Sequence, residues 1–171
     1  MLCLPGMGQA APLNAPAEVR YQGTLSPAGR DGAGAPIKKF DIYSLIEPED
    51  EGGFTVSFLV DERGSGAWPW PDRFGELSLD ATRQSGGTGV RILHEFDEKL
   101  WPVTVPTPLF PHFDRLATGA TWNSGRLAYE VTGEQKTGGR DCWVVEVSTN
   151  FGPQQTTWVE KTSGLVVRSR N

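Results

Sequence analysis

The feature that most constrains this chain is a short-range alternation of apolar and polar residues that recurs from residue 18 onward. In 54–61, Phe and Val residues alternate with Thr, Ser and Asp. Successive side chains of a β-strand point to opposite faces, so this period of two predicts a strand with one buried face. The same period predicts strands at 19–25, 40–46, 76–82, 90–96, 127–132, 142–149, 156–160 and 165–168.

Glycine-rich and acidic turns separate these segments. The chain holds 21 Gly and 13 Pro, about a fifth of its 171 residues, which favours many tight turns over long helices. The acidic run 47–51 joins 40–46 to 54–60 in a predicted hairpin, and 86–89 is predicted as the turn between 76–82 and 90–96. One or two helical turns are expected, at 71–74 and 111–117, each with an early proline.

Short antiparallel strands at this spacing predict a mainly all-β fold, a sandwich or a barrel rather than βαβ units. Pro102, Pro106, Pro108 and Pro111 interrupt the middle of the chain. Because proline donates no ladder hydrogen bond, this stretch is predicted to be an edge or a long surface connection. It divides the strands into two groups, but we expect one domain over 18–171.

The N-terminal segment 1–17 is predicted to be the remnant of a signal peptide followed by a disordered lead-in. Gly8 and Ala10 are small residues at the −3 and −1 positions of a cleavage site, and an Ala/Pro-rich stretch follows. A periplasmic or secreted protein is therefore expected. No apolar run approaches the length of a spanning helix. If Cys3 is removed with this segment, Cys142 remains alone, and we expect it to be a small buried residue.

The C-terminal third carries a resemblance to a known family. The residues are Gly-Ala-Thr-Trp at 119–122, Tyr-Glu-Val-Thr-Gly at 129–133, Gly-Arg-Asp-Cys-Trp-Val-Val-Glu-Val at 139–147, Thr-Trp-Val-Glu at 157–160 and Ser-Gly-Leu-Val-Val-Arg at 163–168. This pattern resembles the closing meander of bacterial periplasmic proteins related to the LolA-type lipoprotein carriers. The resemblance implies a fold of a single curved antiparallel sheet, a half-barrel, whose concave side accepts acyl chains.

Motifs for catalysis, metals and cofactors are missing from the sequence. His94 begins a His-Glu-x-x segment, but Glu98 stands where a zinc motif needs its second histidine. His112 is predicted to be a loop residue that begins a short turn. There is no Gly-x-Ser-x-Gly elbow, and the glycine-rich 29–34 lacks phosphate-binding spacing. We therefore expect no enzyme, no metal site and no cofactor. A hydrolase built on loop carboxylates is the third alternative, with Asp61, Glu62, Asp72 and Glu76 as its candidate residues.

The net charge of −5 and the absence of a Lys/Arg cluster argue against a nucleic-acid partner. Two hypotheses about function remain. In the first, aromatic side chains line a concave face that binds an apolar ligand or lipid. In the second, these side chains fill the core of a structural or interaction domain whose partner is an envelope protein. The candidate ligand-binding residues are Phe54, Phe58, Trp68, Trp70, Trp143 and Trp158.

Overall fold

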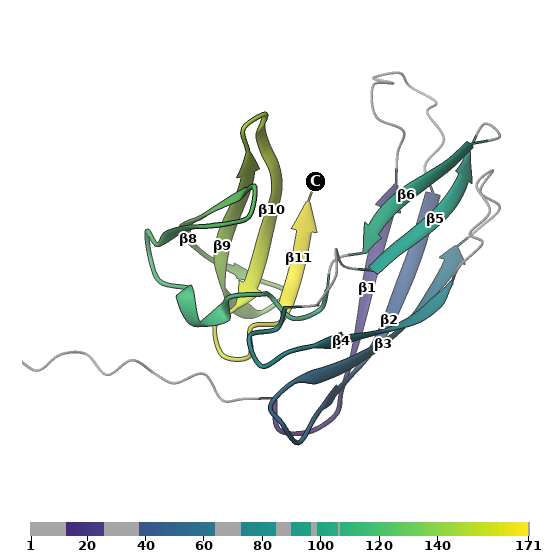
Figure 1. Ribbon diagram of the computed structural model, residues 1–171, viewed down its shortest axis with the longest axis horizontal. Coiled ribbons are helices and arrows are strands. Elements are labelled where there is room, and N and C mark those ends of the chain that lie inside the picture. Colours follow the sequence, from purple (N-terminus) through teal and green to yellow (C-terminus); the bar gives the residue numbers. More distant parts are fainter. Residues whose placement is uncertain are drawn as a thin grey trace, which may run out of the picture. The chain divides into compact units, whose positions relative to one another are not determined.

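The computed structural model describes residues 13–25, 38–63, 73–84, 90–96, 99–105 and 107–170, with the 90–105 hairpin described through its backbone. The chain divides into two compact units, Ala15–Pro108 and a second that contains Leu109–Asn171. Figure 1 shows that both units consist mainly of β-strands, and the one helical element among the described residues is a single 3₁₀ turn. The mainly all-β antiparallel prediction is therefore confirmed.

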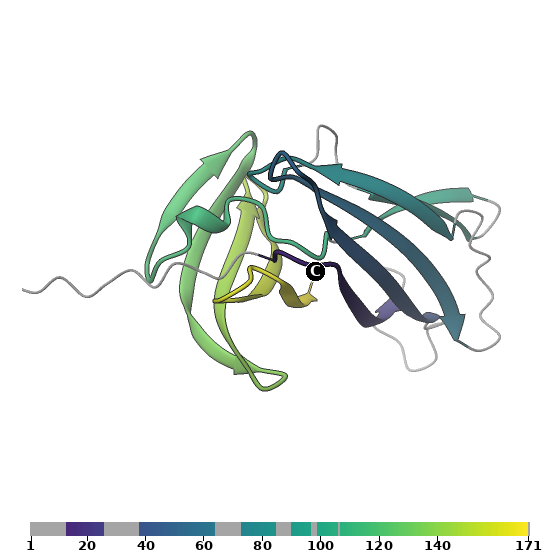
Figure 2. The same cartoon turned by 90° about the horizontal axis from the view of Figure 1, so that it is seen from below.

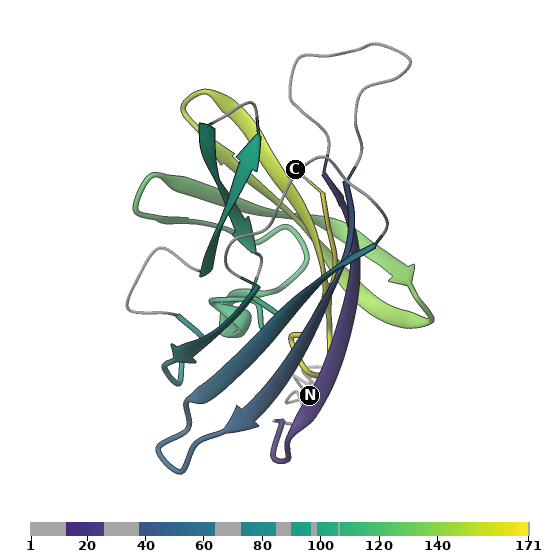
Figure 3. The same ribbon diagram turned by 90° about the vertical axis from the view of Figure 1, so that its right-hand side faces the viewer.

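The N-terminal sheet has the strand order β1-β2-β3-β4, and its four strands lie side by side in Figure 3. These strands are β1 (Ala17–Leu25), β2 (Lys38–Pro48), β3 (Phe54–Arg63) and β4 (Phe74–Leu79). All neighbours are antiparallel, and the predicted β2–β3 hairpin is confirmed. The strand predicted at 76–82 begins earlier and ends in a turn, so Phe74 is a strand residue rather than part of a helical turn.

One face of this sheet is apolar. Its most buried side chains are Ile46, Val56, Val60 and Leu79, each at most 2% exposed. Two phenylalanines on the central strands cover glycines of the outer strands. Phe40 lies over Gly23, and a Cβ on Gly75 would lie 2.7 Å from the Phe58 ring. A glycine opposite an aromatic ring gives the ring room to lie flat on the outer strand.

The second pairing is a hairpin of β5 (Val90–Phe96) and β6 (Lys99–Val105). The turn predicted at 86–89 lies outside the described residues, and the strands before and after it do not pair with each other, because β4 pairs with β3 and β5 pairs with β6. Pro102 lies within β6 opposite Leu93. Since β6 has one partner among the described strands, this proline lies in an edge strand, as predicted.

The C-terminal sheet is a meander in the order β11-β10-β9-β8-β7. Its strands are β7 (Thr121–Ser124), β8 (Leu127–Thr137), β9 (Arg140–Thr149), β10 (Gly152–Glu160) and β11 (Val166–Arg170). The 3₁₀ turn η1 (Phe113–Arg115) precedes it, within the region predicted to be helical. Gly138 and Gly139 both have positive φ, which a two-residue hairpin between β8 and β9 requires.

The C-terminal sheet is curved, as Figure 2 shows for β8 and β9. The register shifts between Val131 and Gly133 and again between Pro153 and Gln155. Such β-bulges bend a strand and increase its twist. The apolar face that results is filled by the chain's own side chains, namely Phe110, Tyr129, Val131, Val145, Val147, Val159 and Val166, none more than 9% exposed.

Candidate interaction surface

The predicted ligand-binding residues are divided between the two units. Phe54 and Phe58 lie on β3, whereas Trp143 lies on β9 and Trp158 on β10. Trp68 and Trp70 lie outside the described residues. Phe54 is 7% exposed, and the Arg83 guanidinium lies 5.7 Å from its ring centroid. Burial lowers the pKa of Arg83.

Trp143 and Trp158 are on opposite faces of the C-terminal sheet. Trp158 is paired with Val144, so it shares a face with that residue and not with its neighbour Trp143. Each ring contacts a cation of the same chain: Lys161 Nζ lies 3.9 Å from the Trp143 centroid, and the Arg168 guanidinium lies 4.8 Å from that of Trp158. The register therefore does not place both tryptophans on one ligand-binding face.

A groove of about 300 Å³ lies over β7, β8 and β9, at the lower end of the range for ligand pockets. Two carboxylates, Glu130 and Glu146, are directly paired across its floor. Its lining is mixed rather than apolar: Thr121, Trp122, Asn123, Ala128, Tyr129, Glu130, Glu146, Val147, Ser148 and Pro153. A mixed lining of this kind does not suit an acyl chain.

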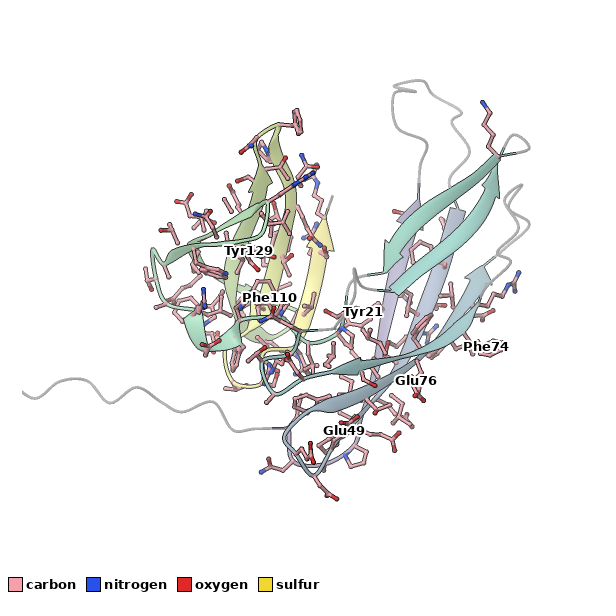
Figure 4. All side chains as sticks on the ribbon, viewed as in Figure 1. Tyr21, Glu49, Phe74, Glu76, Phe110 and Tyr129 are labelled. Carbon is pink, nitrogen blue, oxygen red and sulfur yellow. The ribbon has the colours of Figure 1, made fainter. Side chains whose placement is uncertain are left out.

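His112 begins the 3₁₀ turn, as predicted, and it is also part of an aromatic cluster. It is 8% exposed, and its ring meets those of Trp122 and Tyr129 edge-on at 6.3 and 6.2 Å. Those two rings stack with centroids 5.0 Å apart, and Phe110 contacts Tyr129 (Figure 4). Burial raises the pKa of Tyr129. This cluster anchors the loop before β7 onto the sheet.

The candidate carboxylates of a hydrolase do not come together where they are described. Asp61 is paired with Asp41, whereas Glu76 is paired with Ser57. The two carboxylates are therefore about four residues apart along the strand direction, roughly 13 Å, beyond the usual spacing of a glycosidase pair. Among the residues that the structure describes, no three His, Cys, Asp or Glu side chains form a metal-ligand group.

The feature that stands out is a row of exposed apolar side chains on the polar face of the N-terminal sheet. Tyr43 on β2 is paired with Leu59 on β3, and Leu59 is paired with Phe74 on β4. Their exposed fractions are 38%, 48% and 80%. We call these three residues the exposed row. Figure 4 labels Phe74 on β4, and the pairing places it on the opposite face from Tyr21.

An ion pair continues the exposed row onto β1. Arg20 is paired with Tyr43, and its guanidinium lies 5.2 Å from the Tyr43 ring centroid. It also donates a hydrogen bond of 3.1 Å to Asp41, whose side chain is 2% exposed. This hydrogen bond raises the pKa of Arg20. A cation–π contact and a carboxylate together hold the arginine against the Tyr43 end of the row.

Sequence reasoning missed the exposed row, although a signal for it existed. Each of its three members is an apolar residue at a position where the alternation of its strand calls for a polar one. A single such exception is common on protein surfaces. Only the pairing of β2, β3 and β4 shows that the three exceptions are neighbours.

Comparisons with known proteins leave the family open. No family model matches the chain, and no curated protein matches it. A crystal structure of a DUF1329 family protein from Desulfovibrio piger is similar at 14% sequence identity and a TM-score of 0.29. The match covers 90% of this chain and 63% of that protein, so the chain spans less than two thirds of its length. The resemblance to LolA-type carriers stays a prediction.

Proposed function

We propose that this chain is an interaction domain of an exported protein and that it docks another protein through the exposed row. The observation that carries the proposal is the pairing of Tyr43, Leu59 and Phe74 on one solvent-facing side of a sheet. Their exposed surface together is on the order of 300 Å², a patch of the size that is often functional on a monomer. Aromatic side chains are also enriched at the centres of protein interfaces.

The alternative of an apolar ligand has less support. The apolar face of the C-terminal sheet is filled by its own valines and aromatic rings, and the nearby groove has a mixed polar and apolar lining. Trp143 and Trp158 each contact a cation of the chain, so one face of each ring is occupied. Ligand binding on this sheet would require side chains to leave their present packing. The acyl-carrier hypothesis therefore stays a prediction that rests on the family resemblance.

Site-specific photo-crosslinking in cells of the native host tests the proposal. A benzophenone amino acid replaces Phe74 in one variant and Phe151 in another. Phe151 is a matched control, because it is 96% exposed and lies in the turn before β10, in the other compact unit. We expect a discrete protein adduct from position 74 and none of the same mass from position 151.

A second substitution ties the adduct to the exposed row. Adding Leu59→Asp to the position 74 variant places a charge in the middle of the row, and the adduct is expected to disappear. If position 74 gives no adduct, or if both positions give the same one, the exposed row is not the interface and the proposed function is wrong.

A further inference from the structure

Exposed carboxylates lie in the rows on either side of the exposed row. On one side the pairing places Glu18, Leu45, Ser57 and Glu76 in one line across β1 to β4. This line lies two residues along each strand from the exposed row, about 7 Å away. Its two ends are exposed glutamates, and Figure 4 labels Glu76 beside Phe74.

The other side also carries negative charge. There Asp41 is paired with Asp61, and Asp61 is exposed. Asp41 is buried and bound by Arg20, so the exposed carboxylate on this side is Asp61, while the Arg20 side chain itself is 48% exposed. Further along β2 lie Glu47 at one end and Lys39 at the other, both exposed.

Among the described side chains of this face, four exposed carboxylates therefore accompany two exposed cations, Lys39 and Arg20, of which Arg20 is paired with the buried Asp41. The four carboxylates are Glu18, Glu47, Asp61 and Glu76. We call these carboxylates the acidic rim. An apolar centre with a rim of one sign selects a partner with an apolar centre and a rim of the opposite sign.

This charge pattern disfavours two other occupants. A second copy of the chain would bring one acidic rim against another, and like charges across an interface oppose association. An anionic membrane surface would meet the same repulsion, because such surfaces attract Lys and Arg rather than carboxylates. The chain as a whole, with a net charge of −5, adds to both effects.

We infer that the partner is a protein segment that inserts apolar side chains against Tyr43, Leu59 and Phe74 while its Lys or Arg residues face the acidic rim. This inference rests on the proposed function, because it names the chemistry of the partner at that same surface. The exposed row supplies the contact area, and the acidic rim supplies the preference for one charge.

Binding of two synthetic peptides to the purified full chain tests this inference. The peptides share their leucines and differ only in carrying Lys or Glu between them, and fluorescence anisotropy reports binding. We expect the Lys peptide to bind at least about tenfold more tightly than the Glu peptide. That preference should shrink as salt rises from about 50 to about 300 mM, because exposed charges are screened.

Two pairs of substitutions separate the acidic rim from net charge. Glu18→Gln with Glu76→Gln removes two rim carboxylates and is expected to lower the affinity for the Lys peptide several-fold. Glu130→Gln with Glu146→Gln changes the net charge equally on the C-terminal sheet and is expected to leave the affinity unchanged. Leu59→Thr is expected to abolish binding of the Lys peptide.

The outcomes distinguish this inference from the proposed function. Equal binding of both peptides, binding of neither, or equal weakening by the two pairs of substitutions overturns the basic-partner inference, while crosslinking from position 74 would still support the proposed function. Leu59-dependent sedimentation with phosphatidylglycerol vesicles overturns it in favour of a membrane surface. A dimer that Leu59→Thr dissociates in analytical ultracentrifugation overturns it in favour of a second copy. Loss of the crosslink alone refutes the proposed function.

Discussion

Replacing Phe74 by threonine should leave the stability of the free protein almost unchanged, although it removes an aromatic ring. The residue is 80% exposed, so folding takes only about a fifth of its surface out of water. Since full burial of a Phe or Leu side chain stabilises by about 1.5–3 kcal/mol, this fraction corresponds to about 0.3–0.6 kcal/mol. Threonine keeps a high β-propensity, so the strand itself is not penalised.

Leu59→Thr extends the same reasoning to the centre of the exposed row. Leu59 is 48% exposed, so about half of its surface is buried and the expected loss is about 0.8–1.5 kcal/mol. Ile46→Ala serves as the contrast in the same sheet, because Ile46 is 0% exposed. Truncating a fully buried isoleucine costs about 2–5 kcal/mol.

Urea unfolding followed by tryptophan fluorescence measures all three variants, because none of them alters a tryptophan. The three positions lie in one compact unit, so they report on the same transition. A change in midpoint at constant m-value reads directly as a change in stability. If Phe74→Thr lowered the free energy of unfolding by more than about 2 kcal/mol, the ring would be covered in solution. The exposed row would then not exist as a surface.

Two further substitutions and one thiol reaction test contacts elsewhere in the chain. Gly23→Ala should lower the free energy of unfolding by about 1–3 kcal/mol in urea titrations, because its Cβ would overlap the Phe40 ring. Lys161 lowers the pKa of Glu134 through a 2.5 Å ion pair. The ion pair therefore stabilises the fold at pH values above the pKa of Glu134 in the unfolded chain, about 4.3, and this stabilisation is lost as the pH falls below that value. Lys161→Met should therefore flatten the acid limb of a stability–pH curve. Cys142 is 1% exposed and burial raises its thiol pKa, so native protein should react far more slowly with a disulfide reagent at pH 8 than urea-unfolded protein.

Each of these expectations has its own control or contrary result. Gly133→Ala is the matched control for the first, because a Cβ there would meet no atom within 4 Å. A loss of stability as large at position 133 as at position 23 would mean that the ring contact is not the cause. An acid limb equally steep with and without Lys161 would show that this ion pair does not contribute. Equal thiol reaction rates for native and unfolded protein would mean that Cys142 is accessible in the fold.

The strands could be predicted from the sequence because their signals are local. The alternation at 54–60 and the turn at Gly138–Gly139 each involve neighbouring residues, and the structure has β3 and the β8–β9 hairpin there. Pairing is a long-range property, so the alternation at 90–96 could predict a strand but not its neighbour. The neighbouring strand, β6, was not predicted, because it contains Pro102. In sequence, a proline in an edge strand cannot be told from one that interrupts a central strand.

The candidate residues show a second limit, which is register. Trp143 and Trp158 lie in adjacent strands and look alike in sequence, but the pairing of Trp158 with Val144 puts them on opposite faces. A shift of one residue would reverse this result, because side chains alternate with a period of two. The bulge near Pro153 contributes such a shift between β9 and β10. No local pattern reports how many residues a bulge inserts.

Counting aromatic residues in the sequence does not show what each ring contacts. The rings of Phe54, Trp143 and Trp158 each lie near a cation of their own chain, so their abundance reflects the packing of this protein as much as any ligand. An exposed apolar residue by itself needs no explanation. Tyr43, Leu59 and Phe74 differ because they are in register across three adjacent strands, on a face whose exposed carboxylates outnumber its exposed cations. Covering a surface of that kind is favourable for a partner that is apolar at its centre and basic at its edge.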